Sequence, residues 1–237
     1  MTALPLRIKI CGLVRQDDAR LAREAGADLI GAVLVPSSPR CVTPEQARRL
    51  GRAADLPLAV VVAGLTPDEV VAVAEQAGAA VIQLHDDTPP EAMGRIRDGG
   101  PWELWKAARV RSGEDMERAA REFGPLVDLL LLDAWHPLQL GGTGHRFPWS
   151  ELEACRDRMP VDLPLGVAGG LDPDSVGEAV RRLAPALVDV SSGVEQAPGR
   201  KDPDRVHHFV RQARAAALHT AATTQPTSLA PEAPETP

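Results

Sequence analysis

Residues 58–69 read Leu-Ala-Val-Val-Val-Ala-Gly-Leu-Thr-Pro-Asp-Glu, a short apolar run followed by a helix-start signal. The run Leu58–Val62 is continuous rather than alternating, which is typical of a parallel strand buried on both faces. The segment Thr66–Glu69 combines a capping threonine, a proline at the first helical position and a glutamate at the third. Apolar residues then recur from Val70 to Ala77 at the spacing of one helical face. The stretch therefore predicts a strand, a loop and a helix.

The same unit recurs along the chain. Further helix-start signals stand at Thr43, Thr88, Ser112, Ser150, Asp172 and Asp202. The short apolar runs are Leu6–Ile10, Leu29–Val35, Leu58–Val62, Ala79–Leu84, Glu103–Val110, Val127–Leu132, Leu163–Ala168 and Ala186–Val190. Eight strand–helix units in about 210 residues predict an α/β fold, a single closed (β/α)8 TIM barrel. The alternative is a doubly wound open sheet, which often has a glycine-rich loop after its first strand, and no GxGxxG follows the first run here.

Composition and charge indicate where the folded domain ends and argue against several classes of protein. We expect residues 1–217 to form the barrel and residues 218–237, rich in Ala, Thr and Pro, to form a disordered tail. The net charge of −7 argues against a broad nucleic-acid-binding surface. No apolar run approaches the roughly 18 residues of a membrane span, and the first residues lack a signal-peptide pattern. We therefore expect a cytoplasmic protein with no membrane association.

The cysteines and histidines give no sign of a metal site. Cys11, Cys41 and Cys155 are widely spaced and form no CxxC pair, which disfavours zinc and a redox dithiol. The histidines other than His85 form no convincing ligand set with a carboxylate. We therefore expect no metal.

In a barrel of this kind, functional groups gather at the carboxyl ends of the strands. Two glycine-bearing segments stand there, Ala168–Gly170 after the seventh run and Ser191–Gly193 after the eighth. Their backbone N–H groups and hydroxyls, with a helix start nearby, predict a phosphate site. The simpler interpretation is that these glycines only serve tight turns.

Other polar residues at strand ends are candidates for catalysis. Cys11 ends the first run and Asp133 the sixth, and a thiolate with a carboxylic acid can form a proton-transfer pair. Arg40 is a candidate for holding a second anion, a carboxylate, through its guanidinium fork. His85 is either a substrate contact or a histidine satisfied by the fold. The alternatives are a buried structural Cys11, a turn-capping Asp133 and a solvated Arg40.

Several segments, in this order, resemble the phosphoribosylanthranilate isomerase family, (β/α)8 enzymes of tryptophan biosynthesis. Among them are Lys9-Ile-Cys-Gly12, Val81-Ile-Gln-Leu-His85, Gly141-Gly-Thr-Gly144, Ala168-Gly-Gly-Leu171 and Asp189-Val-Ser-Ser-Gly-Val-Glu195. The resemblance runs from Ile8 to about Ala215. It implies a small-molecule substrate, N-(5-phosphoribosyl)anthranilate, and a rearrangement that needs neither cofactor nor metal.

The resemblance also implies roles for individual residues. Asp133 would be the general acid that protonates the ribose ring oxygen, Cys11 the general base that takes the proton from C2, and Arg40 the partner of the anthranilate carboxylate. The substrate-binding candidates are His85, Gly142, Gly144, Gly169, Gly170, Ser191, Ser192 and Gly193. Of these, Gly170, Ser192 and Gly193 would cradle the phosphate, and the Gly141–Gly144 loop would fold over the substrate.

Departures from the family pattern keep other functions open. Ala32 and Leu34 stand where phenylalanines are usual, and Ala63 replaces a usual asparagine. One alternative is an isomerase or epimerase of another sugar phosphate, which would want metal ligands or a carboxylate in place of Cys11. Another is a non-catalytic phosphate-binding barrel. The oligomeric state, monomer or homodimer, stays open.

Overall fold

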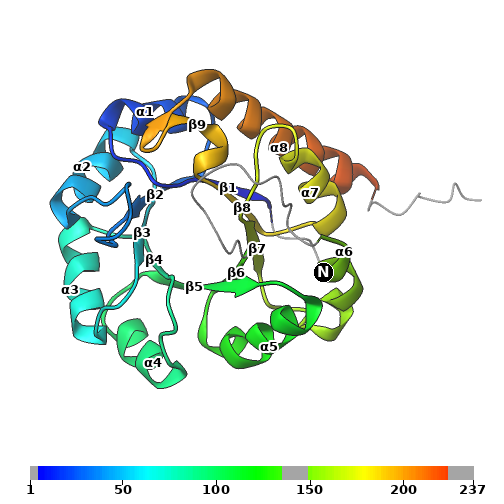
Figure 1. The fold of residues 1–237 in the computed structure, drawn as a ribbon, viewed down its shortest axis with the longest axis horizontal. Coiled ribbons are helices and arrows are strands. Elements are labelled where there is room, and N and C mark those ends of the chain that lie inside the picture. The colour runs from blue at the N-terminus through cyan, green and yellow to red at the C-terminus, as the bar shows by residue number, and fades with distance from the viewer. Residues whose placement is uncertain (1–4, 135–148, 224–237) are drawn as a thin grey trace, which may run out of the picture.

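The computed structural model describes residues 5–134 and 149–223, and these form a closed barrel of eight parallel strands surrounded by helices (Figure 1). Each strand pairs with its neighbours in the sequence, and β8 pairs with β1. The strands are β1 Arg7–Ile10, β2 Leu29–Val33, β3 Leu58–Val62, β4 Val81–Leu84, β5 Glu103–Val110, β6 Leu129–Ala134, β7 Leu165–Ala168 and β8 Leu187–Val190. The predicted barrel is confirmed, and no predicted strand end differs from the observed one by more than two residues.

The helices pack against the outside of the barrel (Figure 1). They are α1 Gln16–Glu24, α2 Pro44–Ala54, α3 Pro67–Ala77, α4 Pro90–Asp98, α5 Gly113–Phe123, α6 Trp149–Cys155, α7 Val176–Leu183 and α8 Pro203–Thr223. Short 3-10 turns stand at η1 Gly124–Leu126, η2 Arg156–Arg158 and η3 Ser192–Val194. A small antiparallel hairpin that the sequence did not predict, β9 Glu195–Ala197 with β10 Arg200–Lys201, lies between β8 and α8.

Most of the predicted helix starts are present. Thr43 and Thr66 each form a full capping box, in which the side chain accepts from the third helical N–H and that residue's side chain caps in return. Ser112 accepts from the Asp115 N–H, and Asp202 accepts from the Arg205 N–H. These contacts satisfy backbone groups that a helix leaves unpaired at its first turn.

Three predicted helix starts are wrong. Thr88 does not cap α4, because its hydroxyl donates to the Asp86 carboxylate, and the N-cap is Pro89 without a side-chain hydrogen bond. Ser150 lies inside α6, which begins at Trp149. Asp172 accepts from two backbone N–H groups in a turn that precedes α7, whose N-cap is Ser175.

The predicted end of the barrel at residue 217 stays a prediction. Helix α8 continues to Thr223, past the expected end of the barrel at residue 217. The remaining tail residues 224–237, and the Gly141–Gly144 segment with Gly142 and Gly144, lie outside the described residues. Among the described helices, none is long and apolar enough to cross a membrane.

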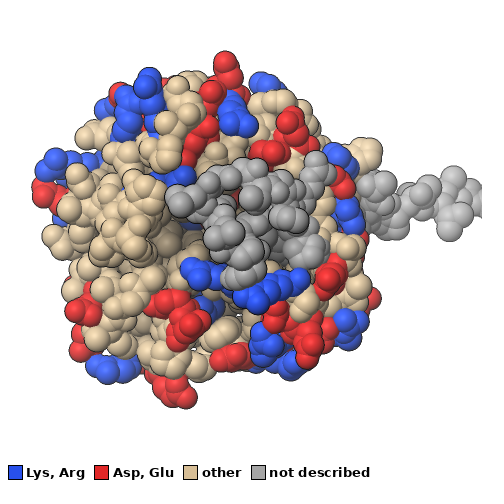
Figure 2. Space-filling view, viewed as in Figure 1, with Lys and Arg blue, Asp and Glu red and all other residues tan. Residues whose placement is uncertain are grey.

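Alternate residues of each strand point into the barrel, so its interior is filled in layers. Toward the amino ends of the strands, an apolar cluster that includes Trp105, Leu129 and Leu187 fills the interior. Above it, the inward positions turn polar at the carboxyl ends. On the face shown in Figure 2, basic and acidic side chains are intermixed around the ring of helices.

Candidate active site

A cavity of about 500 Å³ opens at the carboxyl ends of the strands. Its lining includes residues on, or directly after, every strand of the barrel. All of the predicted site residues that the structure describes border it: Cys11, Arg40, His85, Asp133, Gly169, Gly170, Ser191, Ser192 and Gly193. Residues that are spread over most of the sequence thus share one space.

A buried ion pair forms the floor beneath this cavity. The ammonium of Lys9, fully buried on β1, donates to Asp189 on β8 at 2.9 Å and to Gln83 on β4 at 2.8 Å. Burial alone would lower the pKa of Lys9, but the Asp189 carboxylate and the Cys11 thiol outweigh it and raise that pKa. The other carboxylate oxygen of Asp189 is buried with no partner among the described residues. Lys9 therefore stays charged inside the barrel.

Cys11 lies directly above Lys9 on the same inward face. It follows β1, its N–H donates to the Val190 carbonyl at 2.8 Å, and it is buried. Burial raises the pKa of the thiol, and the positive charge of Lys9 opposes that rise. Gly31 on β2 makes room for both side chains, since a Cβ there would lie 2.7 Å from the Cys11 Sγ and 2.8 Å from the Lys9 Cε.

Asp133 stands on β6, across the mouth from β2. Burial raises the pKa of Asp133 to about 6, the Asp189 carboxylate adds to the rise, and Arg109 and Lys9 oppose it. His85, directly after β4, has its Nε2 3.6 Å from the Asp133 carboxylate. Burial, and then the charge of Arg109, lower the pKa of His85 to about 4, so its imidazole is neutral at neutral pH. Asp133 is thus a carboxyl that can hold a proton near pH 6.

Arg40 is part of an ion network at the edge of the cavity. Its Nε and Nη2 donate to the two carboxylate oxygens of Glu195 at 2.8 and 2.5 Å. The buried Lys201 also donates to Glu195, at 2.9 Å, and to the Ser191 carbonyl. Gly12, with φ +71°, leaves room for the Arg40 side chain to pack against its backbone, because a Cβ on Gly12 would lie 2.5 Å from the Arg40 Cδ. The guanidinium is therefore held in place from below while 20% of the side chain stays exposed.

The segments that follow β7 and β8 are in contact through their backbones. Gly169 and Gly170 have φ of +82° and +68°, a conformation that favours glycine. A Cβ on Gly193 would overlap the Leu171 carbonyl oxygen. Helical turn η3 begins at Ser192, and the first N–H groups of such a turn have no partner within it. The arrangement offers N–H groups and hydroxyls to an anion.

Several residues of the site escaped the sequence analysis. Gln83, Arg109, Asp189 and Lys201 were not singled out as site residues. The signal was present for Lys9, Gln83 and Asp189, each a polar residue inside an otherwise apolar strand. Among the described residues, no group of three or more His, Cys, Asp or Glu side chains could hold a metal ion.

A closed eight-stranded barrel with titratable groups collected at the carboxyl ends of its strands has the architecture of a TIM-barrel enzyme. The family model of N-(5'-phosphoribosyl)anthranilate isomerase matches residues 8–212. The chain belongs to this family of isomerases, which act in tryptophan biosynthesis.

Individual relatives agree with the family model. The chain is 42% identical, over 216 residues, to an N-(5'-phosphoribosyl)anthranilate isomerase of Citrifermentans bemidjiense, covering 90% of this chain and 98% of the relative. The solved phosphoribosylanthranilate isomerase of Thermotoga maritima superposes with a TM-score of 0.80 at 35% identity, covering 89% of this chain and 99% of that one. A solved isomerase in complex with reduced 1-(o-carboxyphenylamino)-1-deoxyribulose 5-phosphate has a TM-score of 0.76 at 33% identity, with the same coverage.

Proposed function

We propose that the mouth of this barrel carries out the Amadori rearrangement of N-(5-phosphoribosyl)anthranilate to 1-(2-carboxyphenylamino)-1-deoxyribulose 5-phosphate. The observation that carries the proposal is the order of groups around the mouth. Asp133 on β6 and Cys11 after β1 flank the glycine segments after β7 and β8. A sugar phosphate held at those segments would have an acid on one side and a base on the other.

The two ends of the substrate fit opposite sides of the cavity. The phosphate would bind the cradle of Gly169, Gly170, Ser191, Ser192 and Gly193. Strands β2 and β3 lie across the barrel from β7, and there Val33, Val61 and Ala63 give an apolar lining. An aromatic ring would rest on that lining, and the sugar would then lie across the centre of the mouth, between acid and base.

Asp133 would supply the first proton. Its protonated carboxyl would donate to the ring oxygen of the ribose while the bond between that oxygen and C1 breaks. The anilino nitrogen would form a double bond to C1, which gives a protonated Schiff base. A carboxyl whose pKa is raised by burial suits this step, because it keeps its proton at a pH where an exposed aspartate has lost it.

Cys11 would take the second proton. Its thiolate would remove the proton from C2, and the electron pair of that bond would move into a C1–C2 double bond and neutralise the Schiff base. The resulting enolamine tautomerises to the ketone. Burial raises the pKa of the thiol, and the buried charge of Lys9 offsets part of that rise, which makes the thiolate easier to form than burial alone would allow.

Arg40 would face the carboxylate of the anthranilate group. An arginine carries five N–H donors, and the Glu195 contacts use two of them. The remaining donors lie on a guanidinium whose orientation is already fixed. His85, neutral and beside Asp133, would contact the sugar through the exposed part of its imidazole ring, of which 26% is accessible.

The test is turnover of the proposed substrate by the purified chain. Freshly prepared phosphoribosylanthranilate is added and its fluorescence is followed. The product is identified as a ketose by NMR and as an isomer of the substrate by its unchanged mass. We expect consumption that depends on enzyme concentration. A folded protein that leaves this substrate unchanged but converts another sugar phosphate in a parallel panel would overturn the proposal, and so would one that binds the product without turnover.

A further inference from the structure

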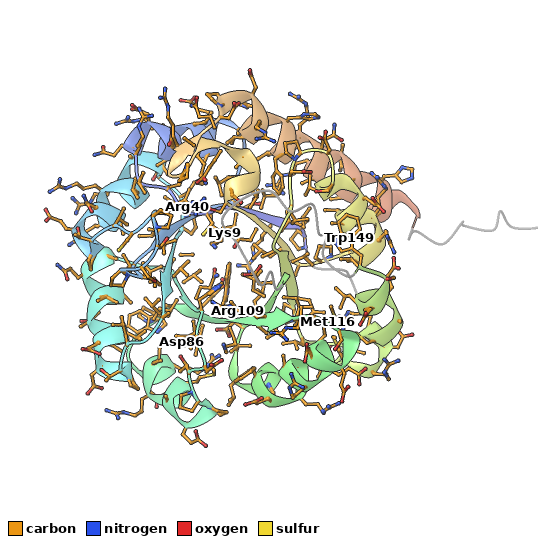
Figure 3. All side chains as sticks on the ribbon, viewed as in Figure 1. Lys9, Arg40, Asp86, Arg109, Met116 and Trp149 are labelled. Carbon is orange, nitrogen blue, oxygen red and sulfur yellow. The ribbon has the colours of Figure 1, made fainter. Side chains whose placement is uncertain are left out.

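Arg109 is a long cationic side chain at the mouth that the proposed reaction does not use. It lies on β5 in register with Asp133 on β6, and register partners on neighbouring parallel strands point to the same side of the sheet. Its side chain is exposed and lines the same cavity as Cys11 and Asp133. Figure 3 places Arg109 on the opposite side of the central opening from Lys9 and Arg40.

The other cations near the mouth already have carboxylate or carbonyl partners. Lys9 is paired with Asp189, and Arg40 with Glu195. Lys106, next to the mouth on β5, donates to the carbonyls of Asp86 and Ala107 and lies over the Phe123 ring. Within residues 5–134 and 149–223, no carboxylate lies within ion-pair distance of the Arg109 guanidinium.

The neighbours of Arg109 leave its charge available to a ligand. His85 is neutral near pH 7, and Asp133, whose carboxylate interacts with the charge of Arg109, loses that negative charge when it holds its proton. In that protonated form neither neighbour compensates the arginine. An incoming carboxylate would do so, and a planar guanidinium binds a carboxylate through two parallel hydrogen bonds.

We propose that Arg109 binds the aromatic carboxylate of the substrate and makes this enzyme selective for an ortho-carboxylated ring. The inference rests on the proposed function, because it takes the substrate to be an anthranilate derivative. With the phosphate at β7 and β8, the aromatic end reaches the half of the mouth between β2 and β5. Arg40 enters that half from the β2 side and Arg109 from the β5 side, so the carboxylate lies within a two-armed arginine clamp.

The test compares two non-reacting analogues of the product, both sugar alcohols that carry the phosphate. One has the 2-carboxyphenylamino group, and the other has a phenylamino group without the carboxylate. Their dissociation constants are measured by calorimetry for wild type, R109M, R109K and the control R52M, in which an exposed arginine of α2 is replaced on the far side of the barrel.

R109M is expected to weaken the carboxylated analogue about tenfold or more and the other analogue less than about twofold. R109K, which keeps the charge but loses the fork, is expected to lie between wild type and R109M, and R52M to match wild type. In turnover, R109M is expected to raise KM about tenfold and to leave kcat within about threefold.

Equal weakening of both analogues, or of neither, would overturn the role of Arg109. If R109M does not fold, R109K carries the same comparison with the same criterion. The two proposals fail separately: selective binding without turnover by wild type contradicts the isomerase function only, whereas turnover with no loss of selectivity in R109M contradicts the clamp only. Wild type that binds neither analogue contradicts both.

Discussion

The carboxylate of Asp133 lies 3.6 Å from the Nε2 of His85, too far for a good hydrogen bond. Because burial and Arg109 hold the pKa of His85 near 4, the imidazole gives Asp133 no positive charge at neutral pH. The pKa of the carboxyl is therefore free to rise with burial, to about 6. The relationship between these two residues makes Asp133 suitable as an acid, and it has a consequence for the pH dependence of the reaction.

The proposed mechanism requires Asp133 protonated and Cys11 ionised, although the pKa of Asp133 is the lower of the two. In the major form the carboxylate is ionised and the thiol is not, so the two forms carry the same number of protons. Their ratio therefore does not change with pH between the two pKa values. We expect kcat/KM to rise with pH up to about 6, to stay flat above it, and to fall only at the pKa of the thiol. A profile at constant ionic strength checks this, and a steady fall between pH 6 and 8 would contradict it.

Asp133 is also expected to cost the fold stability when it ionises. Its folded pKa is raised, so its contribution is fully present below its unfolded pKa near 4 and is lost as pH rises through about 6. The free energy of unfolding of D133N, taken relative to that of wild type, is therefore expected to rise by roughly 3 kcal/mol between pH 4 and pH 8. Urea unfolding of both proteins at the two pH values measures the difference. An unchanged difference would show that the carboxyl is not desolvated.

Gly31 is expected to be essential to the packing of the site. In G31A the new methyl group would press on Cys11 and Lys9 together, which we expect to abolish most activity and to cost about 1–3 kcal/mol. The matched control is G94A in α4, where a Cβ meets no atom within 4 Å and alanine is expected to add about 0.5–1 kcal/mol. Wild-type turnover in G31A would show that the space around the thiol is not tight.

Glu195 is expected to act through Arg40. In E195Q, Arg40 and the buried Lys201 lose their shared counter-charge, so we expect a loss of about 3–5 kcal/mol and a rise in KM larger than the fall in kcat. The control is E153Q, which weakens a similar two-point contact to Arg182 on the surface and should cost much less, because solvent screens an exposed ion pair. Equal costs in the two variants would show that burial adds nothing to the network.

The barrel could be predicted from sequence because the signals that mark its strands and helices are local. Continuous apolar runs and capping boxes such as Thr43–Gln46 and Thr66–Glu69 mark each unit without reference to the rest of the chain. Thr88 shows the limit of local signals, because the same motif failed where Asp86 competed for the threonine hydroxyl. A local pattern predicts what a segment can form, and neighbouring groups decide which contact it makes.

The site was predictable only in part, for a related reason. Cys11 and Asp133 stand where strands end, which a sequence shows. The pairing of Lys9 with Asp189 joins residues 180 positions apart, and nothing local identifies the partner. Likewise, Arg40 was expected to be open to a ligand, and only the fold shows that Glu195 already holds its fork. Charge compensation is a property of the assembled barrel.

The assignment of acid and base is best tested by turnover of phosphoribosylanthranilate in wild type, C11A, D133N and the surface control R52M, with circular dichroism to verify each fold. We expect turnover by wild type and R52M, and a fall in kcat of about 10²–10⁴-fold in each of the other two. A folded C11A or D133N variant with wild-type kcat would contradict the assignment of Cys11 and Asp133 as the base and the acid.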